Sequence, residues 1–288
     1  MVPTEDCIGR WDISVRDAIF PEGAVSALDR PGNGAIRYSI CSIVTKPAEY
    51  ERMVGSFRTR GFNLSDCEFL YVDNTAGNRL DAYAAYNLFF GIAHGAYLIL
   101  CHQDIVLLED DRERLDAVIA ELDTVDPYWG LCGNAGGVRI GKLAVRISDR
   151  GRDNASLNGP FPVRCDSLDE NFIMARRNAN LSLPRDRSGF HFYGTELCIF
   201  AEMLGWNAYV VDFHLNHQGL GTMGSEFLRQ LNLVVEKYQS VLRPRWISTT
   251  CTDLFLSPWW LLNALGNRKR LLQFSRFVGR LMEKRALR

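Results

Sequence analysis

Histidine and carboxylate side chains follow a hydrophobic run near the middle of the chain. Residues 97–101 (YLILC) lead directly into His102-Gln103-Asp104. Mg²⁺ and Mn²⁺ accept oxygen ligands and often bridge one or two carboxylates to substrate phosphates, so Asp104 is a candidate metal ligand that His102 could assist. The tripeptide alone favours a local turn, in which Asp104 caps the next element and His102 packs nearby.

A second pair of potential ligands, His214 and His217, lies far along the chain. Gly219 and Gly221 follow closely, and they predict a loop for this segment. Zinc held by the pair alone is disfavoured, because no cysteine or carboxylate sits at matching spacing. One of these histidines joining Asp104 around a single ion is the more economical hypothesis, and a purely structural role is the alternative.

Glu196 falls in the first turn of a helix predicted for residues 193–204. A carboxylate there suits the helix dipole, so capping explains it. General-base chemistry, in which Glu196 takes the proton of an attacking hydroxyl, is an equally good explanation.

Alternating apolar runs and helical patterns predict the elements that must position these groups. Short β-rich runs at residues 38–44, 67–73, 97–101 and 129–133 are separated by helical patterns over about 47–60, 79–94 and 112–122. This order is typical of an α/β protein with a mostly parallel sheet. Ligands of such sheets bind at the carboxyl ends of the strands, where Asp73 and Asp104 both fall.

Taken in order, these segments resemble the family 2-like glycosyltransferases of GT-A type. More narrowly, they resemble the branch whose metal motif is His-Gln-Asp instead of Asp-x-Asp. The matching pieces span about residues 38–222, and they are residues 40–44, 69–74, 85–87, 93–97, 101–105, 130–137, 168–172 with 176–177, 190–198 and 214–221. The resemblance implies a GT-A type nucleotide-binding sandwich, with helices flanking a mostly parallel sheet and a helical tail after it.

The resemblance also implies roles for individual residues. Asp73 matches the carboxylate that holds the base or ribose of the donor. Asp104 matches the metal-binding aspartate, His102 stands where the family's first acidic residue normally is, and His217 matches the downstream histidine that ligates the metal, ahead of His214. The positions implied to contact the nucleotide-sugar are Val44, Asp73, Asn74, Asn87, His102 and Gln103.

For the catalytic base, the resemblance implies Glu196, whose helix carries this group in the family. Many relatives have an aspartate near position 194, where this chain has Gly194. Asp169 and Glu170, on the acceptor side, are therefore alternative bases.

The implied reaction transfers a sugar from a nucleotide-sugar to a hydroxyl of a glycan or lipid-linked glycan acceptor, with inversion, as in polysaccharide biosynthesis. Mn²⁺ or Mg²⁺ neutralises the diphosphate leaving group. One rival is a nucleotidyltransferase, which would favour a basic glycine-rich loop where this chain has Thr45-Lys46-Pro47. The other is a nucleotide-sugar-binding protein that has lost its base.

Composition excludes some partners and indicates another. A formal net charge of −1 offers no general attraction to nucleic acid, and the acidic N-terminal segment lacks a signal pattern, so we expect a cytoplasmic protein. Residues 268–288 carry eight basic residues and one acidic residue, with apolar residues at helical spacing. Such a helix either contacts the inner membrane surface or packs on the catalytic domain. The predicted domains are 1–37 (lead-in), 38–245 (catalytic) and 246–288 (basic tail).

Overall fold

The computed structural model describes residues 26–29, 35–63, 65–149, 159–219, 224–248, 252–274 and 277–278. The chain forms two compact units, residues 1–222 and 223–288. Most of the predicted lead-in lies outside the described residues, as does the end of the basic tail. The predicted domain boundary after residue 245 stays a prediction.

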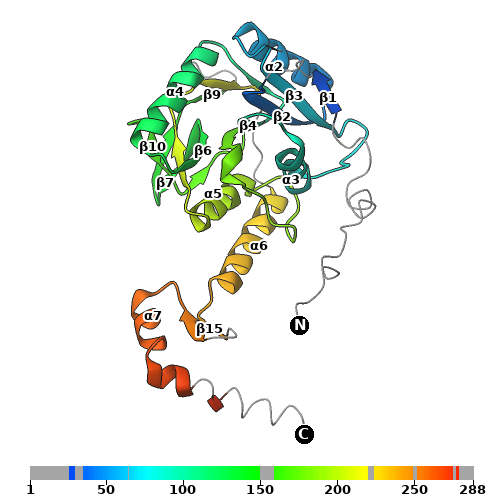
Figure 1. The fold of residues 1–288 in the computed structure, drawn as a ribbon. Coiled ribbons are helices and arrows are strands. Elements are labelled where there is room, and N and C mark those ends of the chain that lie inside the picture. The colour runs from blue at the N-terminus through cyan, green and yellow to red at the C-terminus, as the bar shows by residue number, and fades with distance from the viewer. Residues whose placement is uncertain are drawn as a thin grey trace, which may run out of the picture. The chain divides into compact units, whose positions relative to one another are not determined.

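An eight-stranded sheet dominates the first unit (Figure 1). Five of its strands run in one direction and three run against them, which confirms the predicted α/β class with a mostly parallel sheet. In spatial order the strands are β1 (Ser26–Asp29), β3 (Cys67–Asp73), β2 (Tyr38–Val44), β4 (Tyr97–Cys101), β12 (Phe172–Arg176), β6 (Trp129–Gly133), β13 (Asn207–Val210) and β10 (Val163–Arg164). The antiparallel strands are β1, β12 and β10.

Helices cover both faces of this sheet (Figure 1). The buried residues of α2 (Pro47–Thr59) and α4 (Arg112–Val125) share one apolar cluster, and those of α3 (Ala82–Ile92) and α5 (Tyr193–Met203) share the other. Strand β2 contributes to both clusters, because successive strand side chains point to opposite faces. Burial on both faces is the reason that its sequence is an unbroken apolar run rather than an alternating one.

Two three-stranded sheets complete the first unit. One pairs β11 (Ser167–Leu168), β7 (Ala135–Arg139) and β8 (Lys142–Val145), and the other pairs β5 (Ile105–Val106), β14 (Leu215–His217) and β9 (Ile147–Asp149). A short 3₁₀ turn, Arg177–Ala179, follows β12. The loop predicted around His214 and His217 is wrong at its centre, because pairing with β5 and β9 holds this segment as a strand.

The second unit contains α6 (Ser225–Val241), a hairpin of β15 (Arg245–Ser248) and β16 (Asp253–Leu256), and α7 (Trp260–Gly266). Residues 269–274 are also helical. Within the described part of the chain, every helix is too short or too polar to cross a bilayer.

Candidate metal and donor site

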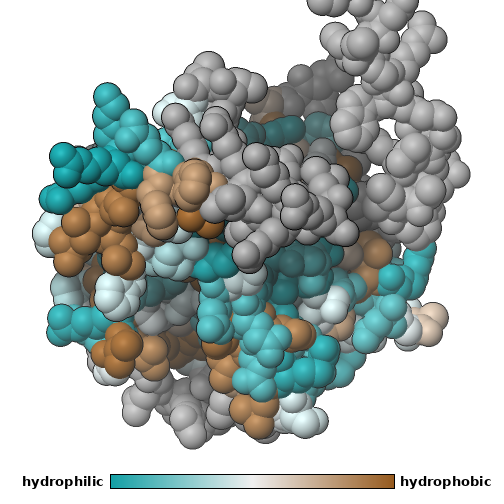
Figure 2. All heavy atoms as spheres, turned by 90° about the horizontal axis from the view of Figure 1, so that it is seen from below, coloured by the Kyte–Doolittle hydropathy of each residue, from teal (hydrophilic) through white to brown (hydrophobic). Residues whose placement is uncertain are grey.

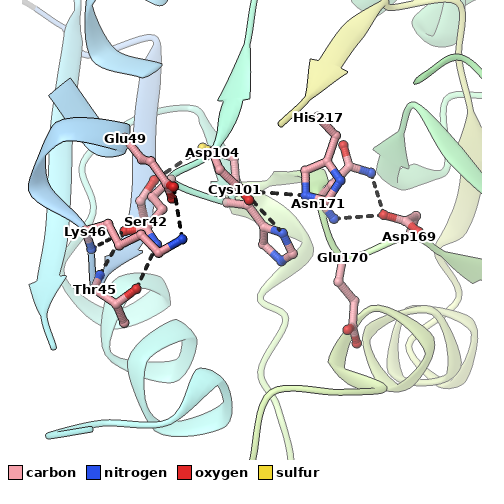
Figure 3. Close-up of polar contacts among 12 residues, drawn as sticks. Ser42, Thr45, Lys46, Glu49, Cys101, Asp104, Asp169, Glu170, Asn171 and His217 are labelled. Carbon is pink, nitrogen blue, oxygen red and sulfur yellow. Dashed lines mark hydrogen bonds and ion pairs between the residues drawn. The ribbon is translucent and has the colours of Figure 1, made fainter. Parts of the chain in front are cut away.

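His102, Asp104 and His217 converge at one edge of the main sheet. His102 and Asp104 follow β4, and His217 ends β14, which pairs with β5 in the register His217–Ile105. One ligand atom from each of the three residues lies within 4.8 Å of the others. Asp104 and His217 point toward one another (Figure 3), with 3.4 Å between His217 Nε2 and Asp104 Oδ1. This geometry suits three ligands of one cation.

Strand geometry selects His217 over His214. Residues three apart along an extended chain point to opposite sides. His217 accordingly faces Asp104, whereas the His214 ring is buried on the other side and its Nε2 lies 3.0 Å from Ser148 Oγ.

The electrostatics of the cluster favour ligand-competent forms. Burial lowers the pKa of His102, which keeps its imidazole neutral near pH 7. Burial would raise the pKa of Asp104, but the hydrogen bond from His217 and the nearby histidines together lower it below its ordinary value. A neutral imidazole and an ionised carboxylate are the forms that bind metal.

A cavity of about 330 Å³, the Asp104 cavity, opens over this cluster. Gly219 lines it, and a Cβ on that residue would lie 2.2 Å from Asp104 Oδ2, so any larger residue would displace the Asp104 carboxylate. Tyr193 and Tyr86 also line it, and the Tyr193 hydroxyl lies 3.2 Å from His102 Nε2 while donating to the Glu170 carbonyl. Sequence reasoning missed both tyrosines, because their helical spacing looks the same as that of core aromatics.

A second cavity of about 440 Å³, the Asp73 cavity, lies at the ends of β2 and β3. Val44 and Asp73 line it, and their role as donor contacts stays a prediction, while Ile43 and Thr45, the neighbours of Val44, line the Asp104 cavity. A hydrogen bond from the Thr75 hydroxyl holds the pKa of Asp73 below its usual range. Tyr50, another lining residue, is buried, and its hydroxyl has no hydrogen-bond partner among the described residues.

Gln103 links the two loops that border the cavities. Its Oε1 accepts from the backbone N–H groups of Thr45 (2.8 Å) and Lys46 (2.9 Å), and its Nε2 donates to Thr45 Oγ1 (2.8 Å). The Gln103 amide therefore holds the loop after β2 in place.

Asn74 and Asn87, also predicted as donor contacts, line neither cavity. Asn74 accepts from the backbone N–H groups of Arg79 and Leu80 and donates to the Leu80 carbonyl. Asn87 exchanges two hydrogen bonds with the backbone of Leu183. Their amides hold loops in place, and a donor-contacting role for them stays a prediction.

The three carboxylates predicted as bases occupy different environments. Glu196 is fully buried and paired with Arg187 at 2.7 Å, and it accepts a hydrogen bond from Tyr83. Asp169 is exposed and its Oδ1 accepts from the backbone and side chain of Asn171. Glu170 points away from both Asp169 and Asn171 (Figure 3).

The carboxylate of Glu170 reaches the N-terminus of α5, where its Oε1 lies 3.4 Å from the backbone nitrogen of Gly194. Burial raises the pKa of Glu170 to about 8. The three carboxylates are absent from the described lining of either cavity. Tyr193 connects the Glu170 backbone to the metal cluster, because its hydroxyl donates to the Glu170 carbonyl and lies 3.2 Å from His102 Nε2.

Fold and site together define an α/β protein with a His-Asp-His cluster at the carboxyl edge of its sheet. The chain belongs to the same family as a protein of Fuscovulum blasticum named ATP synthase subunits region ORF 6. The two are 36% identical over 211 residues, which cover 71% of this chain and 84% of that protein. No family model matches the chain.

Several solved structures resemble the fold at low sequence identity. Mannosyltransferase PcManGT from Pyrobaculum calidifontis, solved with GDP-Man and Mn²⁺, is 11% identical with a TM-score of 0.46, over 75% of this chain and 65% of that one. TarS from S. aureus is 9% identical with a TM-score of 0.44, over 71% of this chain and 40% of that one. The chain thus spans less than two thirds of either structure, and at these TM-scores we base no functional conclusion on them.

Proposed function

We propose that this protein is a metal-dependent glycosyltransferase that moves a sugar from a nucleotide-sugar to a hydroxyl acceptor. The observation that carries the proposal is the convergence of His102, Asp104 and His217 over a cavity at the carboxyl edge of a mostly parallel sheet. The resemblance to family 2-like glycosyltransferases supports the reaction class. A glycan or lipid-linked glycan is the proposed acceptor, and inversion is the proposed stereochemistry.

The donor site would be divided between the two cavities. Asp73, with Val44 and Tyr50, would hold the nucleoside in the Asp73 cavity, since an ionised carboxylate can accept from ribose hydroxyls or base N–H groups. The diphosphate would lie toward the Asp104 cavity. Gln103 would act indirectly, by holding the loop between the cavities.

The ligand set fits a divalent ion such as Mn²⁺ better than Mg²⁺, because two of its three members are imidazoles and Mg²⁺ prefers oxygen alone. When bound, the ion would stabilise negative charge on the diphosphate leaving group. Tyr193, which lies 3.2 Å from His102 Nε2, would orient that ring.

Glu170 is the carboxylate that we propose as the general base. Glu196 is neutralised by Arg187, and Asp169 is engaged with Asn171. Glu170 forms no ion pair among the described residues, and its pKa of about 8 is close to the value that favours proton transfer near neutral pH. It would take the proton of the acceptor hydroxyl as that oxygen attacks the anomeric carbon.

The test of the donor site is a thermal-shift panel of nucleoside diphosphates and nucleotide-sugars, with and without Mn²⁺. A ligand that binds only the folded state raises the melting temperature by mass action. We expect a metal-dependent shift with one nucleotide, abolished in Asp104→Asn and retained in Glu121→Gln, which changes an exposed carboxylate on α4. No shift with any nucleotide in the presence of metal would refute the proposal.

A second candidate, a nucleotide-sugar-binding protein without transferase activity, has one observation in its favour. None of the three predicted bases belongs to the described lining of the Asp104 cavity. Release of free nucleoside diphosphate from the matching nucleotide-sugar, lost in Asp104→Asn, would eliminate this candidate. Nucleotidyl transfer to a sugar phosphate would instead establish the nucleotidyltransferase.

A further inference from the structure

Large apolar side chains stand in solvent across the second unit. Trp259 and Trp260 are 70% and 79% exposed, and Phe274 is 62% exposed. We call this group the α7 surface, and its members are Trp259, Trp260, Leu261, Leu262, Leu265, Leu271 and Phe274. So many large apolar side chains exposed within one short stretch indicate an interaction site, because exposed hydrophobic residues on ordinary surfaces are scattered singly.

The packing of α7 explains why these side chains face outward. Asn263 exchanges hydrogen bonds with the backbone of Ser257, and Asn267 does the same with the backbone of Phe255. Gly266 is buried against the Phe255 ring, where a Cβ would lie 2.2 Å from Phe255 Cδ1. The helix therefore turns its polar and smallest residues toward the hairpin, and its tryptophan and leucines away from it. A helix that only packed on a hairpin would be arranged the other way round.

Positive charge accompanies the α7 surface. Arg268, Lys269 and Arg270 are exposed and take part in no ion pair among the described residues. Between residues 243 and 274, five residues are basic and one, Asp253, is acidic. Hydrophobic and hydrophilic side chains lie side by side on the surface seen in Figure 2.

We infer that the α7 surface docks on an anionic lipid membrane. Tryptophan prefers the boundary between lipid and water, and basic residues beside it are attracted to anionic headgroups. A second copy of this chain is a poorer occupant, because two surfaces of the same positive charge would repel each other. The inference does not depend on the proposed transferase reaction, and the binding would be interfacial, since no described helix is able to span a bilayer.

Vesicle co-sedimentation of the full chain tests this inference. One arm uses phosphatidylcholine vesicles and the other uses vesicles that also contain phosphatidylglycerol. We expect binding only in the second arm, weakened by added salt. Removing three charges with Arg268→Gln, Lys269→Gln and Arg270→Gln should lower the partition coefficient on the order of 100-fold.

The apolar contribution is tested with Trp259→Ser and Trp260→Ser combined, which should weaken vesicle binding by about tenfold or more. Matched controls in the first unit are Val125→Ser with Tyr128→Ser, which are comparably exposed, and Arg52→Gln with Arg139→Gln and Lys142→Gln. Both controls should bind vesicles as the wild type does, and thermal melts of every variant verify folding.

Three results would overturn the inference. They are equal binding to both kinds of vesicle, no binding to either, and wild-type binding by both the tryptophan and the charge variants. Analytical ultracentrifugation identifies the other occupant. A dimer that forms without lipid and is lost in the tryptophan variant, together with no vesicle binding, would assign the α7 surface to a second copy of the chain.

Discussion

Carboxylates at positions 169, 170 and 196 share one chemistry but differ in their surroundings. A guanidinium neutralises Glu196, an amide engages Asp169, and burial raises the pKa of Glu170. The first arrangement stabilises a fold, and the last suits proton transfer. Residue type alone could not separate these roles, because each depends on which neighbours the fold brings into contact.

The pKa of Glu170 predicts a pH profile. A general base acts only when ionised, so kcat/KM should rise as pH increases through about 8 and then level off. The raised pKa of Glu170 also makes the stability of the fold depend on pH. The folded carboxyl holds its proton more tightly than the unfolded one, so stability declines as pH rises from about 4.5 to about 8.

Glu170→Gln should remove both the rising limb of the rate and this decline of the free energy of unfolding. Steady-state rates and urea unfolding at pH 6 and pH 9 provide the measurements. An unchanged pH profile in the variant would exclude Glu170 as the base.

The Arg187–Glu196 pair predicts a large stability effect. Arg187→Met would leave the buried Glu196 carboxylate without its cation, which costs about 3–5 kcal/mol. Adding Glu196→Gln should restore a substantial part of that loss, and urea unfolding measures both variants. If Glu196→Gln alone abolished transfer while leaving stability unchanged, Glu196 would be the base and Glu170 would not.

At the scale of elements, the site depends on loops that hold each other in place. Gln103, in the loop after β4, binds the backbone at Thr45 and Lys46 in the loop after β2. Its position after a strand was visible in the sequence, but its partner was not, because the two loops are more than 50 residues apart.

Replacing Gln103 tests this link. Methionine is similar in size to glutamine, so Gln103→Met removes three hydrogen bonds with little change in volume. We expect nucleotide affinity to fall about tenfold while Mn²⁺ affinity changes little. Calorimetric titration with each ligand separates the two effects. Gln103→Glu retains both acceptor contacts and should lie between wild type and Gln103→Met. An equal loss of metal and nucleotide affinity in Gln103→Met would contradict the role assigned here.

Close packing around Gly194 explains why glycine occupies this position, near which the resemblance implied an aspartate. A Cβ there would lie 2.4 Å from the Leu168 carbonyl oxygen and 3.3 Å from Glu170 Cγ. We expect Gly194→Ala to destabilise the fold by about 1–3 kcal/mol. Gly55→Ala, on α2 with open space around it, should be neutral or stabilising by up to about 1 kcal/mol. Chemical denaturation compares the two, and equal effects would show that α5 moves to make room.

At the scale of the whole molecule, the metal cluster and both cavities belong entirely to the first compact unit. The exposed tryptophans belong to the second unit. The first unit therefore carries the proposed transferase site, and the second carries the proposed membrane-binding surface.

This division predicts how ligands protect the backbone. Mn²⁺ with its matching nucleotide should slow amide exchange in β4 and β14, because local opening there would break the ligand contacts. Exchange in β15, β16 and α7 should not change. Hydrogen exchange followed by mass spectrometry reads both units at once, and protection of the hairpin would mean that the second unit contributes to the donor site.

The sequence by itself determined the strands at residues 38–44, 67–73, 97–101 and 129–133, whose limits match those observed. It also determined the α/β class and the position of Asp73 and Asp104 at strand ends. These features are local, because apolar periodicity and strand-end polarity are written into consecutive residues.

Tertiary structure alone decided which distant groups meet. It brought His217 rather than His214 to Asp104, through the pairing of β14 with β5, and it enclosed Glu196 with Arg187. Such contacts follow from strand register and from the packing of α5, which depend on residues far apart in the chain. A one-residue change of register would have turned the other histidine toward the site.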